Sequence, residues 1–133
     1  MWQFGAKSLE QLRGVRSELV LVVSRALLYS PIDFAVIEGV RSPERQRLLY
    51  LKGLSMTMQS KHLTGHAVDL MAIGDLNRDG LIDHQDKAIT WDREWYGAIA
   101  EAMQKASVEL GIETRWGGTF KPNFFDGPHF ELV

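Results

Sequence analysis

Apolar residues recur at spacings of three and four along the first part of the chain, which is the pattern of one buried helix face. This pattern predicts a helix that ends before Pro31, because proline and the residue before it both resist helical continuation. The next apolar run, residues 34–38, is rich in β-forming residues and closed by Gly39, which predicts a strand. The apolar positions of the predicted helix are Leu12, Val15, Leu19, Val22, Val23, Ala26 and Leu27.

Two further helices are predicted from their end signals. Ser42 followed by Pro43 is typical of an N-cap with proline at the first helical position, and Gly53 is a suitable stop for a helix that runs to about Leu51. A second amphipathic helix should end at Gly111. The apolar positions of that helix are Trp95, Ile99, Ala102, Met103, Ala106 and Leu110.

Shorter segments complete the predicted order of elements. Residues 53–64 are polar and read as a loop, residues 75–86 as an acidic loop, and residues 67–72, 112–116 and 129–133 as strands. This order predicts an α+β fold in which a small antiparallel sheet packs against helices. A chain of 133 residues is expected to form a single domain, here spanning residues 1–133.

Composition and charge exclude several classes of function. The net charge of -2 and the lack of basic blocks argue against a nucleic-acid partner. The most apolar stretch, residues 19–28, is too short and too polar for a membrane span. No charged segment followed by an apolar run marks a signal peptide at the start, so we expect synthesis in the cytoplasm. The absence of cysteine means that any metal must be held by histidines and carboxylates.

Two segments carry the residue types of a catalytic zinc site. Residues 60–69 contain His62 and Asp69, and residues 125–132 contain His129. A catalytic zinc ion takes three protein ligands and keeps a fourth position for water, a need that two histidines and one carboxylate meet. A turn at Gly65 would let His62 and Asp69 converge.

Two charged residues near these ligands suit the chemistry of peptide hydrolysis. Asp126 lies three residues before His129, on a turn with Gly127 and Pro128, and is the candidate general base that moves a proton from water to the leaving amine. Arg41, at the corner between the predicted strand and helix, is the candidate cation for the oxyanion of the tetrahedral intermediate.

The two segments resemble the Ser-x-His-x-x-Gly-x-Ala-x-Asp and Asp-x-Pro-His-Phe-Glu signatures of the M15 zinc peptidase family, and within it the phage L-alanyl-D-glutamate peptidase endolysins. The resemblance extends over nearly the whole chain, including residues 39–42 and 115–118. It implies the fold that these peptidases share with Hedgehog signalling domains. The site residues that it implies are His62, Asp69 and His129 for zinc, Asp126 as the base, and Arg41 for contact with the substrate or the oxyanion. Ser60 is a further candidate for substrate contact.

Two positions depart from relatives of this kind. Thr119 stands where many relatives carry an acidic residue after Trp-Gly-Gly. The dipeptidase branch uses Glu as its base, whereas this chain offers Asp126, which favours the endolysin branch.

Residues 75–86 match the pattern of an EF-hand calcium loop, with oxygen-bearing side chains at the ligand positions and Gly80 at the sharp turn. The last position is Asp86 in place of the usual Glu, as in the dockerin-type loops that this segment resembles. We expect calcium to order this segment and to raise activity; the alternative is a solvated acidic loop. The predicted calcium ligands are Asp75, Asn77, Asp79, Leu81 through its carbonyl, Asp83 and Asp86.

The remaining histidines and Glu131 have plainer expected roles. His66 is expected to be structural or solvated, and His84 to lie in solvent. Glu131 either accepts a hydrogen bond from a metal-binding histidine or faces water, and the sequence does not separate the two.

The aromatic residues are expected to serve mainly the core. Trp91, Trp95 and Trp116 are predicted to anchor it, while Trp116 and Phe124 also flank the ligand-bearing segment and so are candidates for the cleft.

These features predict a zinc endopeptidase of phage or prophage origin that cuts the L-Ala–D-Glu bond of peptidoglycan stem peptides. We expect a monomer that accumulates in the cytoplasm, requires a holin for release, and acts on the wall in the periplasm. The alternatives are a D,D-carboxypeptidase or dipeptidase of the same family, a non-catalytic zinc and calcium module that binds cell wall, and a calcium-regulated interaction protein.

Overall fold

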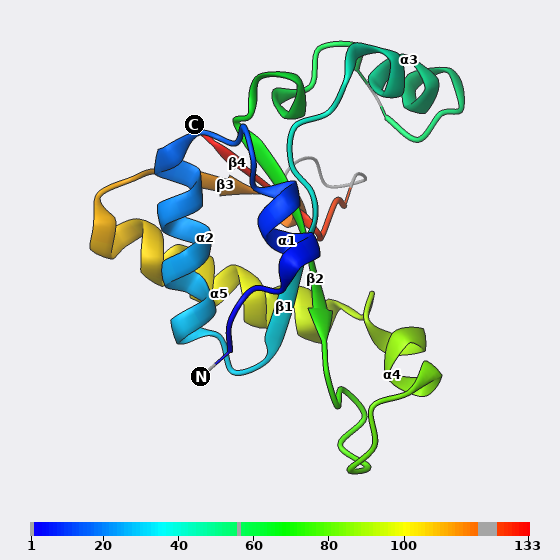
Figure 1. Ribbon diagram of the computed structural model, residues 1–133, viewed down its shortest axis with the longest axis vertical. Helices are drawn as coiled ribbons and strands as arrows, with labels where there is room; N and C mark the ends of the chain where they lie inside the picture. The colour runs from blue at the N-terminus through cyan, green and yellow to red at the C-terminus, as the bar shows by residue number, and fades with distance from the viewer. Residues whose placement is uncertain (1, 56, 120–124) are drawn as a thin grey trace.

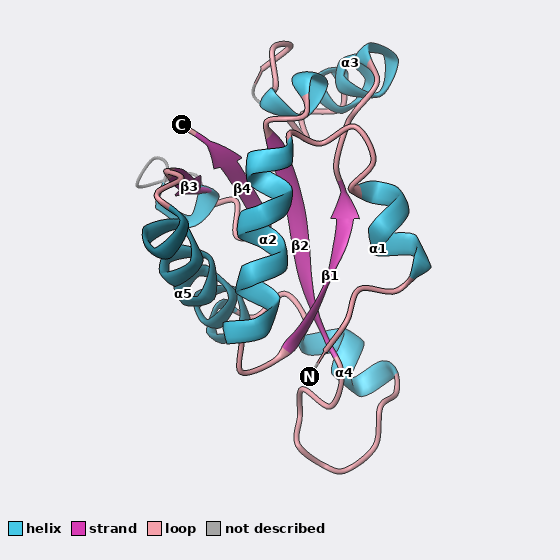
Figure 2. Cartoon of the chain, turned by 60° about the vertical axis from the view of Figure 1, so that its left-hand side comes forward, coloured by secondary structure: helices cyan, strands magenta, loops and turns pink. Residues whose placement is uncertain are grey.

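The computed structural model is built around a four-stranded antiparallel sheet with two long helices on one face (Figures 1 and 2). It describes residues 2–55, 57–119 and 125–133. The predicted α+β class is confirmed, and the strand order in the sheet is β1-β2-β4-β3. The elements are α1 (Ala6–Gln11), α2 (Ser17–Tyr29), β1 (Asp33–Glu38), α3 (Pro43–Leu51), the 3₁₀ turn η1 (Lys61–Thr64), β2 (Ala67–Ile73), α4 (His84–Ile89), α5 (Arg93–Leu110), β3 (Thr114–Trp116), the 3₁₀ turn η2 (Gly117–Thr119) and β4 (His129–Leu132).

The first predicted helix is wrong in its extent, because the chain forms two helices there. α1 ends at Gln11, Gly14 in the following turn has a φ of 81°, and α2 begins at Ser17. Glycine adopts this left-handed conformation without the strain that a side chain would add. Leu12 and Val15 are buried from the turn between the helices, so their spacing imitates a helix that the backbone does not form.

Two short helical segments lie where loops were predicted. η1 falls in the predicted loop of residues 53–64, and α4 begins inside the acidic loop. Each begins at a side-chain cap: the Ser60 hydroxyl accepts from the His62 amide, and the Asp83 carboxylate accepts from the Gln85 amide. Such short helices contain too few residues to show an apolar repeat, so apolar spacing alone does not predict them.

Alternation along the strands divides the sheet into a core face and an outer face. Phe34 pairs with Ala72, and Val68 pairs with Phe130, and all four side chains are buried in one cluster with residues of α2 and α5. Trp95 on α5 joins this core, as predicted. The strand residues between these core positions point to the outer face, because successive side chains in a strand alternate.

A β-bulge interrupts this alternation at the end of β1. The register between β1 and β2 is regular up to Val36, but the next pair joins Glu38, not Ile37, to Asp69. Strict alternation would place Glu38 on the same face as Val36, in the core. The extra residue, Ile37, moves Glu38 to the outer face beside Asp69, as bulges do when they redirect a side chain.

The two ends of the sheet carry different additions. α3 and the segment after it stand at one end, and α4 with the acidic loop stands at the other (Figure 1). Gln46 is the buried residue of α3, while Leu48 and Leu51 are exposed, so polar contacts rather than apolar packing hold this helix. No helix within the described ranges is long and apolar enough to cross a membrane.

Candidate metal centre

Asp69 and His129 lie opposite each other on adjacent strands. The register of β2 and β4 pairs them directly, and directly paired residues of antiparallel strands project from the same face. Their neighbours Leu70 and Phe130 are buried in the core. Asp69 and His129 therefore project from the outer face, where helices α2 and α5 do not cover them.

His62 reaches the same place from η1. Gly65 ends η1 with a φ of 75°, and a Cβ at this position would meet the Gly14 carbonyl oxygen at 2.6 Å. The predicted turn at Gly65 is thus present, and the position excludes a side chain. The His62 Nδ1 lies 2.9 Å from the carbonyl oxygen of Gly39. Because a carbonyl oxygen only accepts, Nδ1 carries the proton and Nε2 keeps its lone pair.

The three predicted ligands come together. His62 Nε2 lies 3.3 Å from Asp69 Oδ1, and His129 Nδ1 lies 3.4 Å from the same oxygen. The three ligand atoms lie within 4.8 Å of one another, and the described part of the chain holds no other such group of three His, Asp or Glu residues. His62 Nε2 and Asp69 Oδ1 are buried and make no hydrogen bond to a described residue. Buried polar atoms normally have partners, so this set of two imidazole nitrogens and a carboxylate oxygen fits a bound cation such as zinc.

The charge balance of the three residues keeps Asp69 ionised. Burial opposes ionisation, but the neighbouring imidazoles of His129 and His62 outweigh it and hold the pKa of Asp69 well below its usual range. Burial also works against a charged His129, yet the carboxylates of Asp69 and Glu131 raise its pKa on balance.

Glu131 orients one of the three candidate ligands. Its Oε1 lies 2.8 Å from His129 Nε2, which settles the two expectations for Glu131 in favour of the histidine contact. Since a carboxylate only accepts, Nε2 carries the proton and His129 turns Nδ1 toward Asp69. Lys61 Nζ lies 3.1 Å from Glu131 Oε2 and also donates to the Leu132 carbonyl, so this carboxylate is held from both sides.

The three candidate ligands line a cleft of about 470 Å³ that also contains Asp126, Arg41 and Ser60. Asp126 follows the segment 120–124, which lies outside the described residues, and its amide donates to the Gly117 carbonyl. Its carboxylate accepts no hydrogen bond from a described residue. Burial, followed by the negative charge of Asp69, raises the pKa of Asp126.

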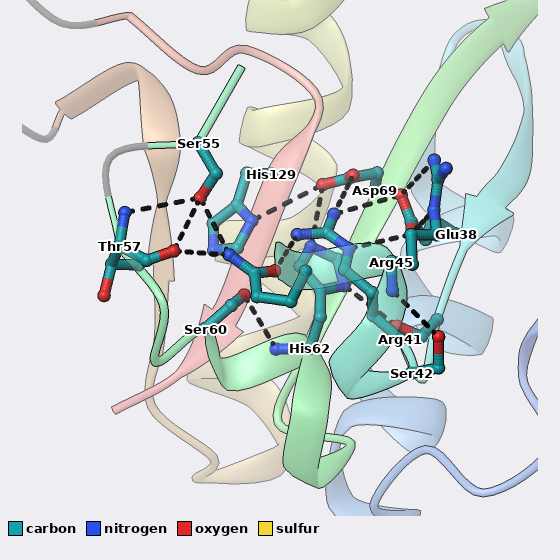
Figure 3. A network of polar contacts seen from close by, with 12 residues as sticks. Glu38, Arg41, Ser42, Arg45, Ser55, Thr57, Ser60, His62, Asp69 and His129 are labelled. Atoms are coloured by element: carbon teal, nitrogen blue, oxygen red, sulfur yellow. Dashed lines mark hydrogen bonds and ion pairs between the residues drawn. The ribbon is translucent and has the colours of Figure 1, made fainter. Parts of the chain in front are cut away.

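Arg41 is buried in a polar network behind Asp69 (Figure 3). Its Nε and Nη2 donate to the two carboxylate oxygens of Glu38 at 2.8 and 3.0 Å, and its Nη1 donates to Gln46 Oε1 at 2.7 Å. Nη2 also lies 3.7 Å from Asp69 Oδ2. Gln46 in turn donates to the Ser55 hydroxyl and the Thr57 carbonyl, which ties α3 to the segment beyond it.

Glu38, Gln46 and Lys61 are cleft-lining or network residues that the sequence analysis did not single out. Glu38 owes its place to the bulge, which alternation does not reveal. Lys61 stands inside the first motif, at a position that the signature leaves open. Gln46 lies five residues after Arg41 on α3, and its burial is apparent only from the structure.

The carboxylates of the acidic loop, all within the described ranges, accept hydrogen bonds from backbone amides of the loop and do not form a cluster like that of His62, Asp69 and His129. Asp75 accepts from the amides of Asp79 and Gly80, and Asp86 accepts from the amides of Asn77 and Asp83. Gly80 has the positive φ of 87° that the sharp turn of such a loop requires. The calcium ligands thus stay a prediction, in a segment whose turns fit the loop pattern.

The remaining histidines and aromatic residues lie partly in solvent and partly against the core. His84 is exposed as expected, and His66 pairs with the Thr64 hydroxyl at 2.7 Å. The prediction that Trp91 anchors the core is wrong: it is 48% exposed, because it follows α4 at a turn. Trp116 packs against the core. Phe124 lies outside the described residues, and the Thr119 hydroxyl donates to the Trp116 carbonyl.

Comparison with known proteins assigns the family. The chain matches the phage L-alanyl-D-glutamate peptidase family over residues 1–133. It is 33% identical to the L-alanyl-D-glutamate peptidase of Escherichia phage T5, with 99% of this chain and 98% of that protein covered. The crystal structure of the L-Ala D-Glu endopeptidase ChiX of Serratia marcescens superposes with a TM-score of 0.82 at 42% identity, covering 98% of this chain and 90% of that one. The two sequence motifs that carry His62, Asp69 and His129 meet in one cleft. The chain therefore belongs to the phage L-alanyl-D-glutamate peptidase family.

Proposed function

We propose that this protein is a zinc-dependent peptidoglycan endopeptidase that hydrolyses the L-Ala–D-Glu bond of stem peptides. The observation that carries the proposal is the meeting of His62, Asp69 and His129 in the cleft that also holds Asp126. The names of the phage T5 and Serratia relatives support the choice of bond.

His62 Nε2, Asp69 Oδ1 and His129 Nδ1 are the atoms that would hold the metal. A zinc ion held there would supply Lewis-acid chemistry, which polarises a carbonyl group and makes a water molecule more acidic. Glu131 and the Gly39 carbonyl keep the two imidazoles in the tautomers that ligation needs.

Asp126 is the general base in this proposal. It takes the proton of the attacking water and delivers it to the leaving amine. Its raised pKa suits the first half of this task, since a more basic carboxylate accepts the proton of the water more readily. Arg41 and Ser60 complete the site by contacting the substrate, with Arg41 beside the oxyanion of the tetrahedral intermediate.

Replacing Asp126 by Ala tests this assignment. We expect cleavage to fall by about 10²- to 10⁴-fold, the usual contribution of general acid–base catalysis, while the zinc content stays at that of the wild type. Metal analysis and peptide cleavage are measured on the same preparation. Cleavage at an unchanged rate would remove Asp126 from the mechanism.

Mass spectrometry of Gram-negative peptidoglycan digested with the zinc-loaded protein tests the bond. Fragments split between L-Ala and D-Glu would support the proposal. Loss of terminal D-Ala would favour a D,D-carboxypeptidase, and no new fragment from zinc-loaded protein would favour a wall-binding module.

The proposal includes a regulatory calcium ion in the acidic loop. Its support is the spacing of the oxygen ligands and the backbone turn at Gly80. We expect calcium titration to give saturable binding that Asp75→Asn weakens and the exposed control Glu101→Gln, on α5, leaves unchanged. Peptidase activity that is indifferent to calcium removal in the presence of zinc would contradict regulation.

As a phage-family enzyme made inside a host cell, the protein must pass the inner membrane to reach the wall, and we propose that a holin releases it into the periplasm. Expression in a Gram-negative host should cause lysis only after the inner membrane is permeabilised. Gel filtration is expected to give the mass of a monomer.

A further inference from the structure

Among the described residues, three cationic side chains line the cleft, and two of them direct their charged groups to partners within the protein. Arg41 is only 8% exposed and uses Nε, Nη1 and Nη2 for Glu38 and Gln46. Lys61 directs its ammonium to Glu131 and to the Leu132 carbonyl. The charges of Arg41 and Lys61 are thus already paired with carboxylates of the protein before a ligand arrives.

Arg45 is the third cation, and it differs from the other two. Its side chain is 58% exposed while lining the cleft. It contacts Glu38 on one edge, with Nε at 2.7 Å from Oε1 and Nη2 at 3.5 Å from Oε2. Among the described residues, Nη1 has no hydrogen-bond acceptor, so an edge of the guanidinium remains available for a ligand.

Two guanidiniums share the hydrogen bonds of one carboxylate at this place, and a second carboxylate, Asp69, lies 3.7 Å from Arg41. One carboxylate, Glu38, serves both Arg41 and Arg45, and Figure 3 shows the two guanidiniums gathered on it. Arg45 also lies in the first turn of α3, whose N-cap is Ser42, where backbone N–H groups add partial positive charge. The cleft wall at Arg45 is therefore suited to an anion.

The structure of the substrate around the L-Ala–D-Glu bond indicates which anion this is. In a stem peptide cut at L-Ala–D-Glu, the D-Glu residue supplies the leaving amine and has two carboxyl groups. The chain continues through one of them, and the other stays a free carboxylate close to the scissile bond. A guanidinium with an open edge binds such a group through paired, charge-assisted hydrogen bonds.

We infer that Arg45 is a specificity-determining residue that binds the free carboxylate of this D-Glu residue; the inference rests on the proposed function. Glu38 holds the Arg45 side chain in place before the substrate arrives, which reduces the conformational entropy lost on binding. The bulge in β1 thus serves two arginines: it holds one beside the metal ligands and one at the wall of the cleft.

Two synthetic peptides test the inference. Both contain the L-Ala–D-Glu bond, one with the free carboxyl of D-Glu intact and the other with that carboxyl converted to a primary amide. Cleavage of the free-acid peptide by the wild type is measured first and tests the proposed function alone. We then expect kcat/KM of the wild type to be about 10- to 100-fold lower for the amide, mainly through KM.

Arg45→Gln should remove this preference. We expect kcat/KM to fall about 10- to 100-fold on the free-acid peptide and about twofold or less on the amide, with zinc content unchanged. Arg47→Gln, which removes an exposed arginine from the same helix, is the matched control and should keep the wild-type preference. Arg45→Lys keeps the charge without the planar fork and should retain part of it.

Three results would overturn the inference. The wild type would cut both peptides equally well, Arg45→Gln would lose the same factor on both, or Lys61→Gln rather than Arg45→Gln would abolish the preference. Each can be observed only when the free-acid peptide is cut, so each is distinct from failure of the proposed function.

Discussion

Glu131 is a single carboxylate whose position, two residues after His129 on the same strand, decides how that histidine presents its ring. It accepts from Nε2 and is itself held by Lys61. Such outer partners of metal-binding histidines contribute to affinity because they fix the tautomer and orientation of the ring.

Replacing Glu131 by Ala should therefore weaken zinc binding by about 10- to 100-fold, since His129 Nε2 loses its acceptor. Competition with a chromogenic zinc chelator measures the change. Glu113→Ala, an exposed glutamate near β3, is the control and should bind zinc like the wild type. Equal zinc affinity in the Glu131 variant would show that His129 needs no partner to bind the metal.

Asp33, at the start of β1, differs from Glu131 in lacking such partners. Its Oδ1 is buried and has no hydrogen-bond partner among the described residues. Burial raises its pKa, although a hydrogen bond from the Phe34 amide works the other way. A carboxyl whose folded-state pKa is raised costs stability as the pH rises from its unfolded-state pKa through the raised folded-state pKa, because the folded state binds the proton more tightly and solvates the ion poorly.

We expect Asp33→Asn to raise the melting temperature at pH 8 by a few degrees and to have a smaller effect as the pH falls to about 4, where the wild-type carboxyl takes up its proton. Thermal unfolding of both proteins across this pH range measures the difference. A constant difference at all pH values would exclude the burial of charge as its cause.

At the scale of elements, α3 is unusual because it carries cleft residues yet has little apolar packing. Gln46 is 1% exposed, and its amide joins Arg41 on one side to Ser55 and Thr57 on the other. Removing this side chain leaves the buried Arg41 guanidinium without one of its acceptors, which costs about 1–3 kcal/mol.

Gln46→Met keeps the size of the side chain and removes all of these bonds, so α3 should open more often. We expect amide hydrogen exchange in residues 43–51 to accelerate about 5- to 100-fold while α2 and α5 keep their protection. Mass-spectrometric exchange on the two proteins measures this. Faster exchange in α2 and α5 as well would mean that the network supports the whole domain rather than one helix.

Prediction from sequence succeeded for elements with strong caps and long apolar faces. α5 ends at Gly111 and α3 begins after Ser42, as their sequence signals indicate. It failed at Gly14, where a turn kept the helical spacing of buried residues, and at α4 and η1, which are set by side-chain caps rather than by periodicity.

At the scale of the whole molecule, the meeting of His62, Asp69 and His129 was predictable because the three residues lie in two short contiguous motifs. Their partners were not, because Glu38 and Gln46 meet Arg41 through a bulge and a helix that bring distant atoms together. Family resemblance identified the motif residues, whereas the three-dimensional structure was needed to place Arg45 in the cleft wall and to separate it from Arg41.

Zinc should stabilise the folded chain as a whole, because the three ligands come from η1, β2 and β4 and converge only in the folded state. At zinc concentrations about 100 times the dissociation constant, binding adds ~2.7 kcal/mol, which raises the melting temperature by about 10 °C in a domain of this size.

Differential scanning calorimetry with zinc and with a chelator measures this shift. His62→Gln should reduce it strongly, while His66→Gln, a change at the histidine that pairs with Thr64, should retain it. A melting temperature that does not respond to zinc would contradict the proposed metal centre.

The bulge at Ile37 has a consequence for how such an enzyme is able to change over evolutionary time. A substitution alone would place a carboxylate beside Asp69 only by giving up a buried position. One extra residue in the strand instead reverses the alternation of side chains beyond it, so that a position facing the core comes to face the site. The packing of Phe34 and Val36 is retained upstream of the insertion. Residues before the bulge can therefore change to suit the packing of the core, and the residue after it can change to suit the chemistry of the cleft, with little effect of one on the other.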